Sequence, residues 1–223
     1  MSITQYIKAV INFKFTYIRK SFENRSFKLL DVGAGNHSAS RIVSVFQHCE
    51  YYGLDMDKSY NNNDADFKAM KDFYQLDLTG LDYSIVPDDY FDGIWMAHVI
   101  EHLFNGDKVL PGLIKKLAPG GYFYIEYPGK KSTTLPSMKG TLNFKDDSTH
   151  VRLYSVPELT KIFEENGCVV LSSGTRRNWF YIVSLPLRLL ISLVKNGHVQ
   201  GNVFWDLLGF AEYLWVKKKA IVK

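Results

Sequence analysis

The sequence predicts an α/β fold in which a parallel β-sheet is linked by crossover helices. Over residues 28–127, short apolar stretches typical of strands alternate with amphipathic stretches typical of helices. A glycine-containing turn follows the first of these strands, and acidic residues end three of them. Such alternation is typical of parallel sheets, whose ligands lie beyond the carboxyl ends of the strands. The acidic residues therefore mark a candidate site.

The individual elements follow from hydrophobic periodicity. Residues 2–22 place apolar side chains at three- and four-residue steps, which predicts an amphipathic helix leading into the domain. The strands predicted next are Lys28–Val32, Tyr51–Leu54, Phe73–Gln75, Phe91–Met96 and Tyr122–Tyr127. The helices predicted among them are Ser38–Phe46 and His98–Leu117.

The second half of the chain is less regular. Residues 128–154 are rich in Lys, Ser, Thr, Gly and Asp and are expected to form a long functional loop. A serine cap with a proline in the first turn then starts a helix at Ser155, a strand follows over Cys168–Leu171, and Leu185–Val194 is helical in pattern. Residues 211–216 fit either a closing strand or the end of an amphipathic helix, and we favour a last strand near Tyr213.

These elements suggest four parts. Residues 1–26 form an N-terminal amphipathic helix, 27–177 the core, 178–208 a helical cap or interface insertion, and 209–223 a closing strand with a basic tail. With 223 residues and 46% apolar content, the chain can close one sizeable core.

Composition excludes several classes of protein. The two cysteines have no metal-ligand or disulfide spacing, which indicates core thiols in a reducing compartment. Lysines interrupt the N-terminal apolar residues, and Pro186 and Arg188 interrupt the later apolar stretch, so neither a signal peptide nor a membrane span is expected. A cytoplasmic location is the prediction. The net charge is only +4 and no dense basic stripe with aromatics is present, which argues against a DNA-binding module.

The glycine turn lies in residues 29–37, LLDVGAGNH. Gly33 and Gly35 let the backbone approach a ligand closely, and Asp31 can anchor the turn or the ligand's amino-acid portion. A dinucleotide site would have a third glycine to seat the pyrophosphate, whereas this chain continues Asn36-His37-Ser38. The turn therefore favours a nucleoside without phosphates over NAD, in a Rossmann-like fold.

Two further carboxylates end neighbouring strands. Asp55 is placed to accept both hydroxyl protons of a ribose. Asp77 and the backbone amide of Leu78 are placed at the edge of an adenine, one accepting from its amino group and the other donating to a ring nitrogen.

Residues 27–170 resemble the class I S-adenosylmethionine-dependent methyltransferases, in the group with a type 11 or type 23 methyltransferase domain. The glycine turn, Asp55, Asp77, the FDGIWMAHVIEH segment at 91–102 and the LAPGGY segment at 117–122 carry the resemblance. It implies a seven-stranded Rossmann-like three-layer sandwich whose last strand is antiparallel. It also implies S-adenosyl-L-methionine as cofactor, with the cofactor-binding residues Asp31, Gly33, Ala34, Gly35, His37, Asp55, Met56, Asp77, Leu78 and Met96. His37 departs from the family's usual glycine and either contacts the cofactor's carboxylate or caps the next helix at the surface.

Methyl transfer to an alcohol needs a base or a metal to deal with the hydroxyl proton. On the predicted helix after Met96, residues His98, Glu101 and His102 share one face, and His150 approaches from the long loop. The arrangement is similar to the Glu-His metal motif of small-RNA 2′-O-methyltransferases and some ubiquinone-pathway O-methyltransferases, although His98 stands where those have glutamate. Glu101, His102 and His150 are the catalytic candidates. A divalent metal, a histidine base, and a structural role in orienting the helix or loop all remain open.

Three segments of the sequence bear on the substrate and the partners. The loop after Pro128 carries five cations that either recognise phosphate or carboxylate groups or are simply solvated. The aromatic-rich insertion fits a lid, a homodimer interface or a peripheral membrane patch. The THVRLYS segment at 149–155, together with the tail, resembles methyltransferases found with bacterial polysaccharide and lipopolysaccharide assembly genes, which implies a sugar hydroxyl on a nucleotide- or lipid-linked precursor. The alternatives are another small-molecule or RNA acceptor, an NAD enzyme, and a scaffold protein without turnover.

Overall fold

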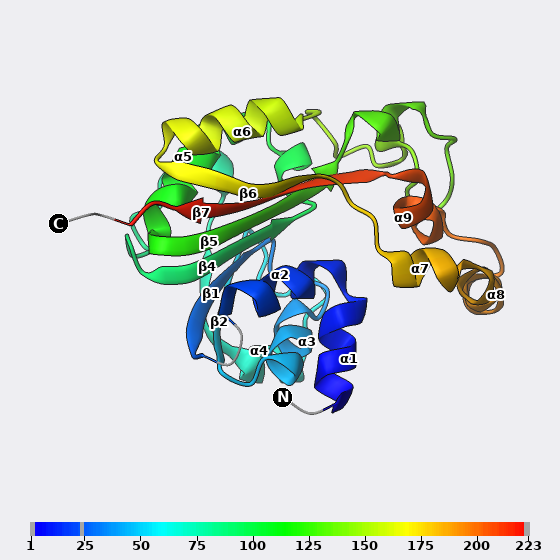
Figure 1. The fold of residues 1–223 in the computed structure, drawn as a ribbon, viewed down its shortest axis with the longest axis horizontal. Coiled ribbons are helices and arrows are strands. Elements are labelled where there is room, and N and C mark those ends of the chain that lie inside the picture. The colour runs from blue at the N-terminus through cyan, green and yellow to red at the C-terminus, as the bar shows by residue number, and fades with distance from the viewer. Residues whose placement is uncertain (1–2, 23–24, 221–223) are drawn as a thin grey trace.

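The computed structural model describes residues 3–22 and 25–220. Its centre is a seven-stranded sheet in the order β3-β2-β1-β4-β5-β7-β6 (Figure 1). The strands are β1 Phe27–Val32, β2 Cys49–Asp55, β3 Met70–Gln75, β4 Phe91–Ala97, β5 Leu117–Pro128, β6 Cys168–Thr175 and β7 Ala211–Lys218. Strand β7 runs antiparallel to both of its neighbours, β5 and β6. The predicted Rossmann-like sheet with an antiparallel last strand is therefore confirmed.

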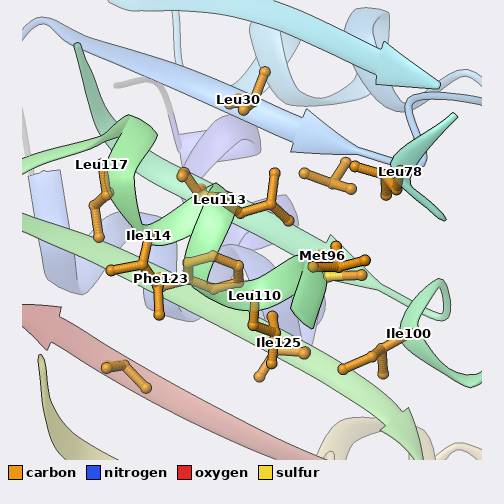
Figure 2. Close-up of a cluster of buried hydrophobic side chains, with 14 of the residues drawn as sticks. Leu30, Leu78, Met96, Ile100, Leu110, Leu113, Ile114, Leu117, Phe123 and Ile125 are labelled. Atoms are coloured by element: carbon orange, nitrogen blue, oxygen red, sulfur yellow. The ribbon is translucent and has the colours of Figure 1, made fainter. Parts of the chain in front are cut away.

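Helices cover both faces of the sheet and form a hydrophobic core on each side. On one face α5 (Gly106–Lys116) packs over β5, with Leu110 and Leu113 against Phe123 and Ile125 (Figure 2), and α6 (Val156–Glu165) packs over β6 and β7. On the other face lie α1 (Ile3–Ile11), α2 (Phe13–Phe22) and α3 (Ser38–Val45). The central strands β1 and β4 are almost wholly buried because both of their faces are covered.

The N-terminal helix predicted over residues 2–22 is two helices in the described residues. The helical conformation is interrupted at Asn12, between α1 and α2, and residue 2 lies outside the described part. Helix α2 packs an aromatic layer on the sheet, where Tyr17 stacks on Tyr124 at 5.1 Å between ring centroids and Phe22 stacks on Phe27 at 4.1 Å. This packing lays α2 along the face of the sheet, and its first residues, Phe13 and Lys14, reach the carboxyl ends of the strands.

The predicted helix over residues 98–117 is wrong over residues 98–105, its first eight positions. His98 has a left-handed backbone with φ 57°, and only a short 3-10 turn, η2 (Ile100–His102), precedes α5 at Gly106. The apolar spacing continues through this turn because Ile100 and Leu103 also enter the core, so periodicity alone does not reveal the break. His98, Glu101 and His102 therefore do not share a helix face.

The remaining elements connect the strands and close one end of the molecule. They are α4 (Asp64–Ala69), η1 (Leu78–Gly80), η3 (Lys130–Thr134), η4 (Phe144–Asp146), α7 (Trp179–Val183), α8 (Leu185–Asn196), η5 (Gly201–Phe204) and α9 (Trp205–Leu208). Helices α7, α8 and α9 lie at one end of the sheet, beyond the end of β5 (Figure 1). Throughout the described ranges, each helix is too short or too polar to span a lipid bilayer.

Candidate active site

Three cavities meet at the glycine turn beyond the carboxyl ends of β1, β2 and β4. The large cavity has a volume of about 610 Å³ and reaches α2, Trp205 and Arg176. The middle cavity, of about 330 Å³, lies between β2 and η1. The small cavity, of about 160 Å³, lies between the turn and α3. Gly33 lines all three, so the turn is their common wall.

Gly33 is the point of this wall at which the backbone comes closest to a neighbouring side chain, that of Val99. Its backbone φ is +80°, and a Cβ atom there would lie 2.4 Å from Cγ2 of Val99, the residue that separates the large and middle cavities. The Gly33 amide donates to the carbonyl of Leu54 at 2.8 Å, which ties the turn to β2. A side chain at position 33 would therefore both strain the backbone and displace the cavity wall.

Asp31 holds the glycine turn in place through two hydrogen bonds. Its Oδ2 atom accepts a hydrogen bond from the Tyr51 hydroxyl at 2.6 Å and another from the Ser38 hydroxyl at the start of α3. Burial and the neighbouring carboxylate raise the pKa of Tyr51 well above its usual value, so this hydroxyl remains a donor. Asp31 also lines the small cavity, where a carboxylate can meet a cationic group.

Asp55, Asp77 and Leu78, which the sequence places at the cofactor, line the middle cavity, and Asp55 and Met56 also line the large one. Asp55 Oδ1 accepts from the amide of Asp57 at 3.1 Å. Asp77 Oδ1 accepts from the amide and hydroxyl of Thr79 at 2.8 and 2.7 Å, which fixes the carboxylate at the start of η1.

Three predicted cofactor residues line none of the three cavities. Met96 is fully buried in the core beside Ile100 and Leu110 (Figure 2), because the side chain that faces the cavities belongs to the next strand position, Ala97. Ala34 is likewise buried in the core on the opposite face. His37 turns away from the cavities and contacts Asp66 of α4 at 2.7 Å.

His37 holds α4 rather than capping α3. Its side chain makes no capping bond to α3, and Asp66 is fully buried. Burial acts to raise the pKa of Asp66, but hydrogen bonds from Ser40, His37 and the backbone of Asn63 outweigh it and lower the pKa to about 2. Asn63 and Asp66 form a capping box at the start of α4, a helix that hydrophobic periodicity did not predict but that this box signals in the sequence.

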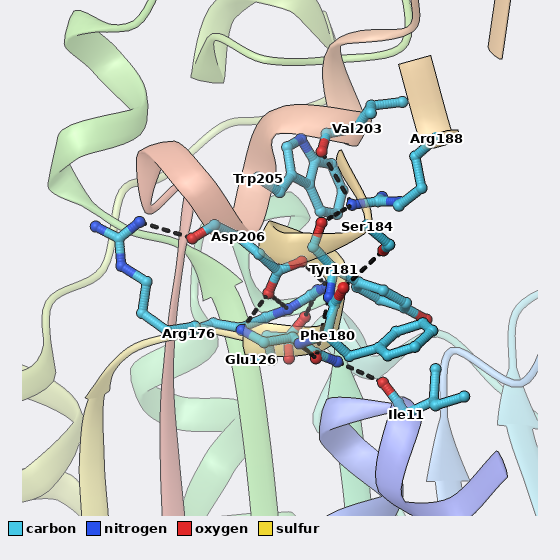
Figure 3. A network of polar contacts seen from close by, with 12 residues as sticks. Ile11, Glu126, Arg176, Phe180, Tyr181, Ser184, Arg188, Val203, Trp205 and Asp206 are labelled. Carbon is cyan, nitrogen blue, oxygen red and sulfur yellow. Dashed lines mark hydrogen bonds and ion pairs between the residues drawn. The ribbon is translucent and has the colours of Figure 1, made fainter. Parts of the chain in front are cut away.

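A buried ionic network forms one side of the large cavity (Figure 3). Arg176, beyond the end of β6, bonds Asp206 of α9 through both Nε (3.1 Å) and Nη2 (2.9 Å) and bonds Glu126 of β5 through Nη1 (2.8 Å). The Tyr124 hydroxyl donates to the other Glu126 oxygen at 2.5 Å. Burial acts to raise the pKa of Glu126, yet Arg176 and His98 hold it well below its usual range. The network joins α9 to the sheet by paired charges.

His98 extends this network from Glu126 to Glu101. Its ring nitrogens lie 3.0 Å from Glu126 Oε1 and 3.3 Å from Glu101 Oε1, and Trp205 lies over the ring at 4.8 Å between centroids. Burial acts to lower the pKa of His98, but the two carboxylates outweigh burial and raise it to about 9. His98 is therefore cationic at neutral pH and bridges two acidic side chains.

The catalytic candidates Glu101, His102 and His150 do come together. One ligand atom from each lies within 4.8 Å of the others, and the rings of His102 and His150 are 4.9 Å apart. Only His102 lines the large and middle cavities, whereas Glu101 and His150 are buried directly behind it. Carbonyl oxygens accept from Nδ1 of each histidine, Thr149 O for His102 at 3.2 Å and Phe144 O for His150 at 2.7 Å. Both Nε2 atoms then carry a lone pair in the neutral ring.

Glu101 Oε2 completes the cluster. It is buried and has no hydrogen-bond partner among the described residues, although its second oxygen faces His98. Buried carboxylate oxygens are normally paired, so the orphaned atom indicates a missing partner at this point. Two imidazole lone pairs and a carboxylate oxygen are a ligand set that suits a divalent cation such as Zn²⁺, Mn²⁺ or Fe²⁺.

Several lining residues were not predicted from the sequence. Val99, Glu126, Arg176 and Trp205 line the large cavity but belong to segments that are distant in the chain. A partial signal exists for Glu126, an acidic residue inside the otherwise apolar strand at 122–127.

Fold and cavities together define a class I methyltransferase architecture, with a nucleoside-sized crevice at the switch point between β1 and β4. A family model described as "Methyltransferase domain" matches residues 5–173, and the chain belongs to that family. No curated protein matches the chain in sequence. By family and fold, the protein is an S-adenosylmethionine-dependent methyltransferase.

Solved structures with low sequence identity share the fold. A putative sarcosine dimethylglycine methyltransferase from Galdieria sulphuraria is 19% identical, with 97% of this chain and 85% of that chain covered and a TM-score of 0.63. Phosphoethanolamine N-methyltransferase 2 from Haemonchus contortus, in complex with S-adenosyl-L-methionine, is 16% identical, with 92% and 51% covered and a TM-score of 0.63. A SAM-dependent methyltransferase from Archaeoglobus fulgidus is 18% identical, with 98% and 100% covered and a TM-score of 0.57.

Proposed function

We propose that this protein transfers the methyl group of S-adenosylmethionine to a hydroxyl group of a sugar or other small molecule, on a precursor of the cell envelope in the cytoplasm. The cluster of Glu101, His102 and His150 beside the large cavity carries the proposal, because transfer to oxygen, unlike transfer to a free amine, requires a group that takes the hydroxyl proton. The two buried free cysteines agree with a reducing compartment.

The three cavities match the parts of the cofactor. Asp77 and Leu78 would hold the adenine in the middle cavity, and Asp55 would accept from the ribose hydroxyls at the boundary with the large cavity. Asp31 would bond the ammonium group of the methionine portion in the small cavity. The large cavity, on the other side of Gly33, would then be left for the acceptor.

The transfer is an in-line displacement. The acceptor oxygen forms a bond to the methyl carbon while the bond from that carbon to sulfur breaks, and the sulfur leaves neutral as S-adenosylhomocysteine. The hydroxyl proton passes to Nε2 of His102, the only member of the cluster that reaches the cavity. Thr149 holds the ring in the required tautomer through Nδ1, and His150 and Glu101 position it from behind.

Glu101, His102 and His150 would also hold a divalent cation, since each offers one ligand atom and Glu101 Oε2 lacks a partner among the described residues. When bound, it would lower the pKa of an acceptor hydroxyl by acting as a Lewis acid. Turnover measured after treatment with a chelator separates the two mechanisms. Activity that survives metal removal assigns the proton to His102 alone, whereas activity that is lost and then restored by Mn²⁺ or Zn²⁺ assigns a metal.

The test is formation of S-adenosylhomocysteine from S-adenosylmethionine with acceptor panels of nucleotide sugars, lipid-linked sugars, amines and RNA. We expect turnover with hydroxyl acceptors, and we expect His102→Gln to abolish it while lowering cofactor affinity far less than it lowers turnover. His48→Gln, at an exposed position before β2, is the matched control. Methylation of an amine or RNA only, or cofactor binding without turnover on any acceptor, would overturn the proposal in favour of those alternatives.

A further inference from the structure

The outward surface of α7 and α8 is apolar. Its exposed side chains are between 44% and 78% accessible and are Trp179, Phe180, Val183, Leu187, Leu190, Ile191 and Val194. Within α8 the last four lie at positions i, i+3, i+4 and i+7, which places them on one face of the helix. We call this set the α7–α8 surface.

Contacts on the other side of these helices fix the direction in which the α7–α8 surface faces. Arg188 donates to the carbonyl of Val203 at 3.1 Å, and Ser192 accepts from the amide of Gln200 at 2.9 Å (Figure 3 shows the first of these). At the start of α7, the Asn178 side chain donates to the carbonyl of Ile11 at the end of α1. The polar face of α8 is therefore held against the domain, and the apolar face is turned outward.

The two segments beside this surface carry charge of a single sign. Residues 1–22 and 176–205, the two segments joined by the contact between Asn178 and Ile11, contain none of the chain's 23 acidic residues. They contain eight of its cations, namely Lys8, Lys14, Arg19, Lys20, Arg176, Arg177, Arg188 and Lys195. The buried network pairs Arg176 with Asp206, the residue that follows the second segment, whereas Lys8 on α1 and Lys195 on α8 are exposed. An outward apolar face beside unopposed lysines is the pattern of a helix that lies in a membrane interface.

We propose that the α7–α8 surface docks on an anionic phospholipid bilayer. The apolar side chains enter the boundary between headgroups and acyl chains, Trp179 lies at the headgroup level, and the lysines attract acidic lipids. A second copy of the chain is a poorer occupant. A two-fold interface through this surface would bring two copies of these basic segments together, and neither segment supplies an acidic side chain to pair with their cations.

Together with the proposed function, on which this step rests, docking in this way sets the side from which the acceptor enters. The large cavity is lined by Phe13 and Lys14 from one of the two basic segments and by Tyr181 and Trp205 from the other. The acceptor would then enter from the side that faces the membrane, which suits a sugar carried on a lipid.

Sedimentation with vesicles tests the docking without any need for activity. The purified full chain is mixed with vesicles of phosphatidylcholine alone or of phosphatidylcholine with phosphatidylglycerol, at low and high salt. We expect the wild-type protein to sediment with the acidic vesicles and to be released by salt. The variant L190E/V194E should bind them about tenfold less or weaker still, because two carboxylates replace inserted side chains. The matched control is I85E/V169E, which adds the same charge at exposed apolar positions elsewhere.

All four substituted side chains are exposed, so folding is expected to survive, and S-adenosylhomocysteine binding by each variant checks it. Equal sedimentation of L190E/V194E and the control would overturn the proposal, as would equal binding of wild type to neutral and acidic vesicles. A wild-type dimer that L190E/V194E converts to a monomer, with no vesicle binding, would assign the surface to self-association instead. Because none of these results involves turnover, a failed acceptor assay leaves them unaffected.

Discussion

Replacing Gly33 with alanine perturbs the cofactor crevice at its narrowest point. An L-residue at φ +80° costs about 1–2 kcal/mol. The new Cβ would also lie 2.4 Å from Val99 Cγ2, and relieving this overlap costs a further ~1–3 kcal/mol, as is typical of overpacking. Because Val99 lines the large and middle cavities, its displacement should weaken cofactor binding by about tenfold or more.

Gly167→Ala is the matched control for the backbone effect. Gly167 has φ +78° and no heavy atom within 4 Å of the Cβ position, so it should lose only the backbone contribution. In the double variant Gly33→Ala with Val99→Ala the Cγ2 atom is absent, and the remaining Val99 Cβ lies at an ordinary 3.8 Å. The double variant should therefore recover part of the cofactor affinity.

Two assays check this set of variants. Chemical denaturation gives the free energy of unfolding, and calorimetry gives the affinity for S-adenosylhomocysteine. If Gly33→Ala is destabilised no more than Gly167→Ala and binds the product as tightly as wild type does, the assignment of the turn as the wall of the crevice is refuted.

Three other predictions concern single side chains. Asp55→Ala should lower S-adenosylhomocysteine affinity by ~1–3 kcal/mol or more in calorimetry, because the ribose hydroxyls lose their acceptor, and unchanged affinity would remove Asp55 from the site. His150→Ala should leave that affinity intact and depress kcat, because the residue positions His102 from outside the cavity; equal kcat would exclude His150. Asp66→Asn should reduce the free energy of unfolding by about 1.5–3 kcal/mol at pH 7, because the charged acceptor of His37 and Ser40 is lost. Since folding lowers the Asp66 pKa to about 2, its contribution is present at neutral pH and falls as the pH drops from about 4 to 2, so the two melting curves should converge in acid; a constant difference between them would contradict this.

The sheet was predictable because local sequence determines it. Apolar stretches that end in Asp31, Asp55 and Asp77 reveal both the parallel strands and the edge where their ligands lie. The side chain of Met96 lies in the core because successive strand side chains point to opposite faces, so a shift of one position exchanges core for cavity. The local sequence does not signal the left-handed backbone at His98. Because that conformation interrupts the predicted helix, His98, Glu101 and His102 do not lie on one helix face.

The rest of the site depends on long-range contacts. Glu126, Arg176 and Asp206 lie on three separate elements, and nothing in their individual contexts indicates that they pair. The approach of His150 to His102 was expected from the long loop, but the burial of His150 behind the cavity wall is set by Phe144 and the packing of that loop. Periodicity identifies the elements, whereas the contacts between distant loops depend on the tertiary fold.

A crystal structure of the protein soaked with S-adenosylhomocysteine is the decisive test of the cofactor crevice. We expect adenine between Asp77 and Leu78, the ribose hydroxyls on Asp55, the amino-acid portion beside Asp31, and the sulfur facing the large cavity past Gly33. A crevice that stays empty at saturating ligand, or a nucleoside bound elsewhere on the protein, would contradict it.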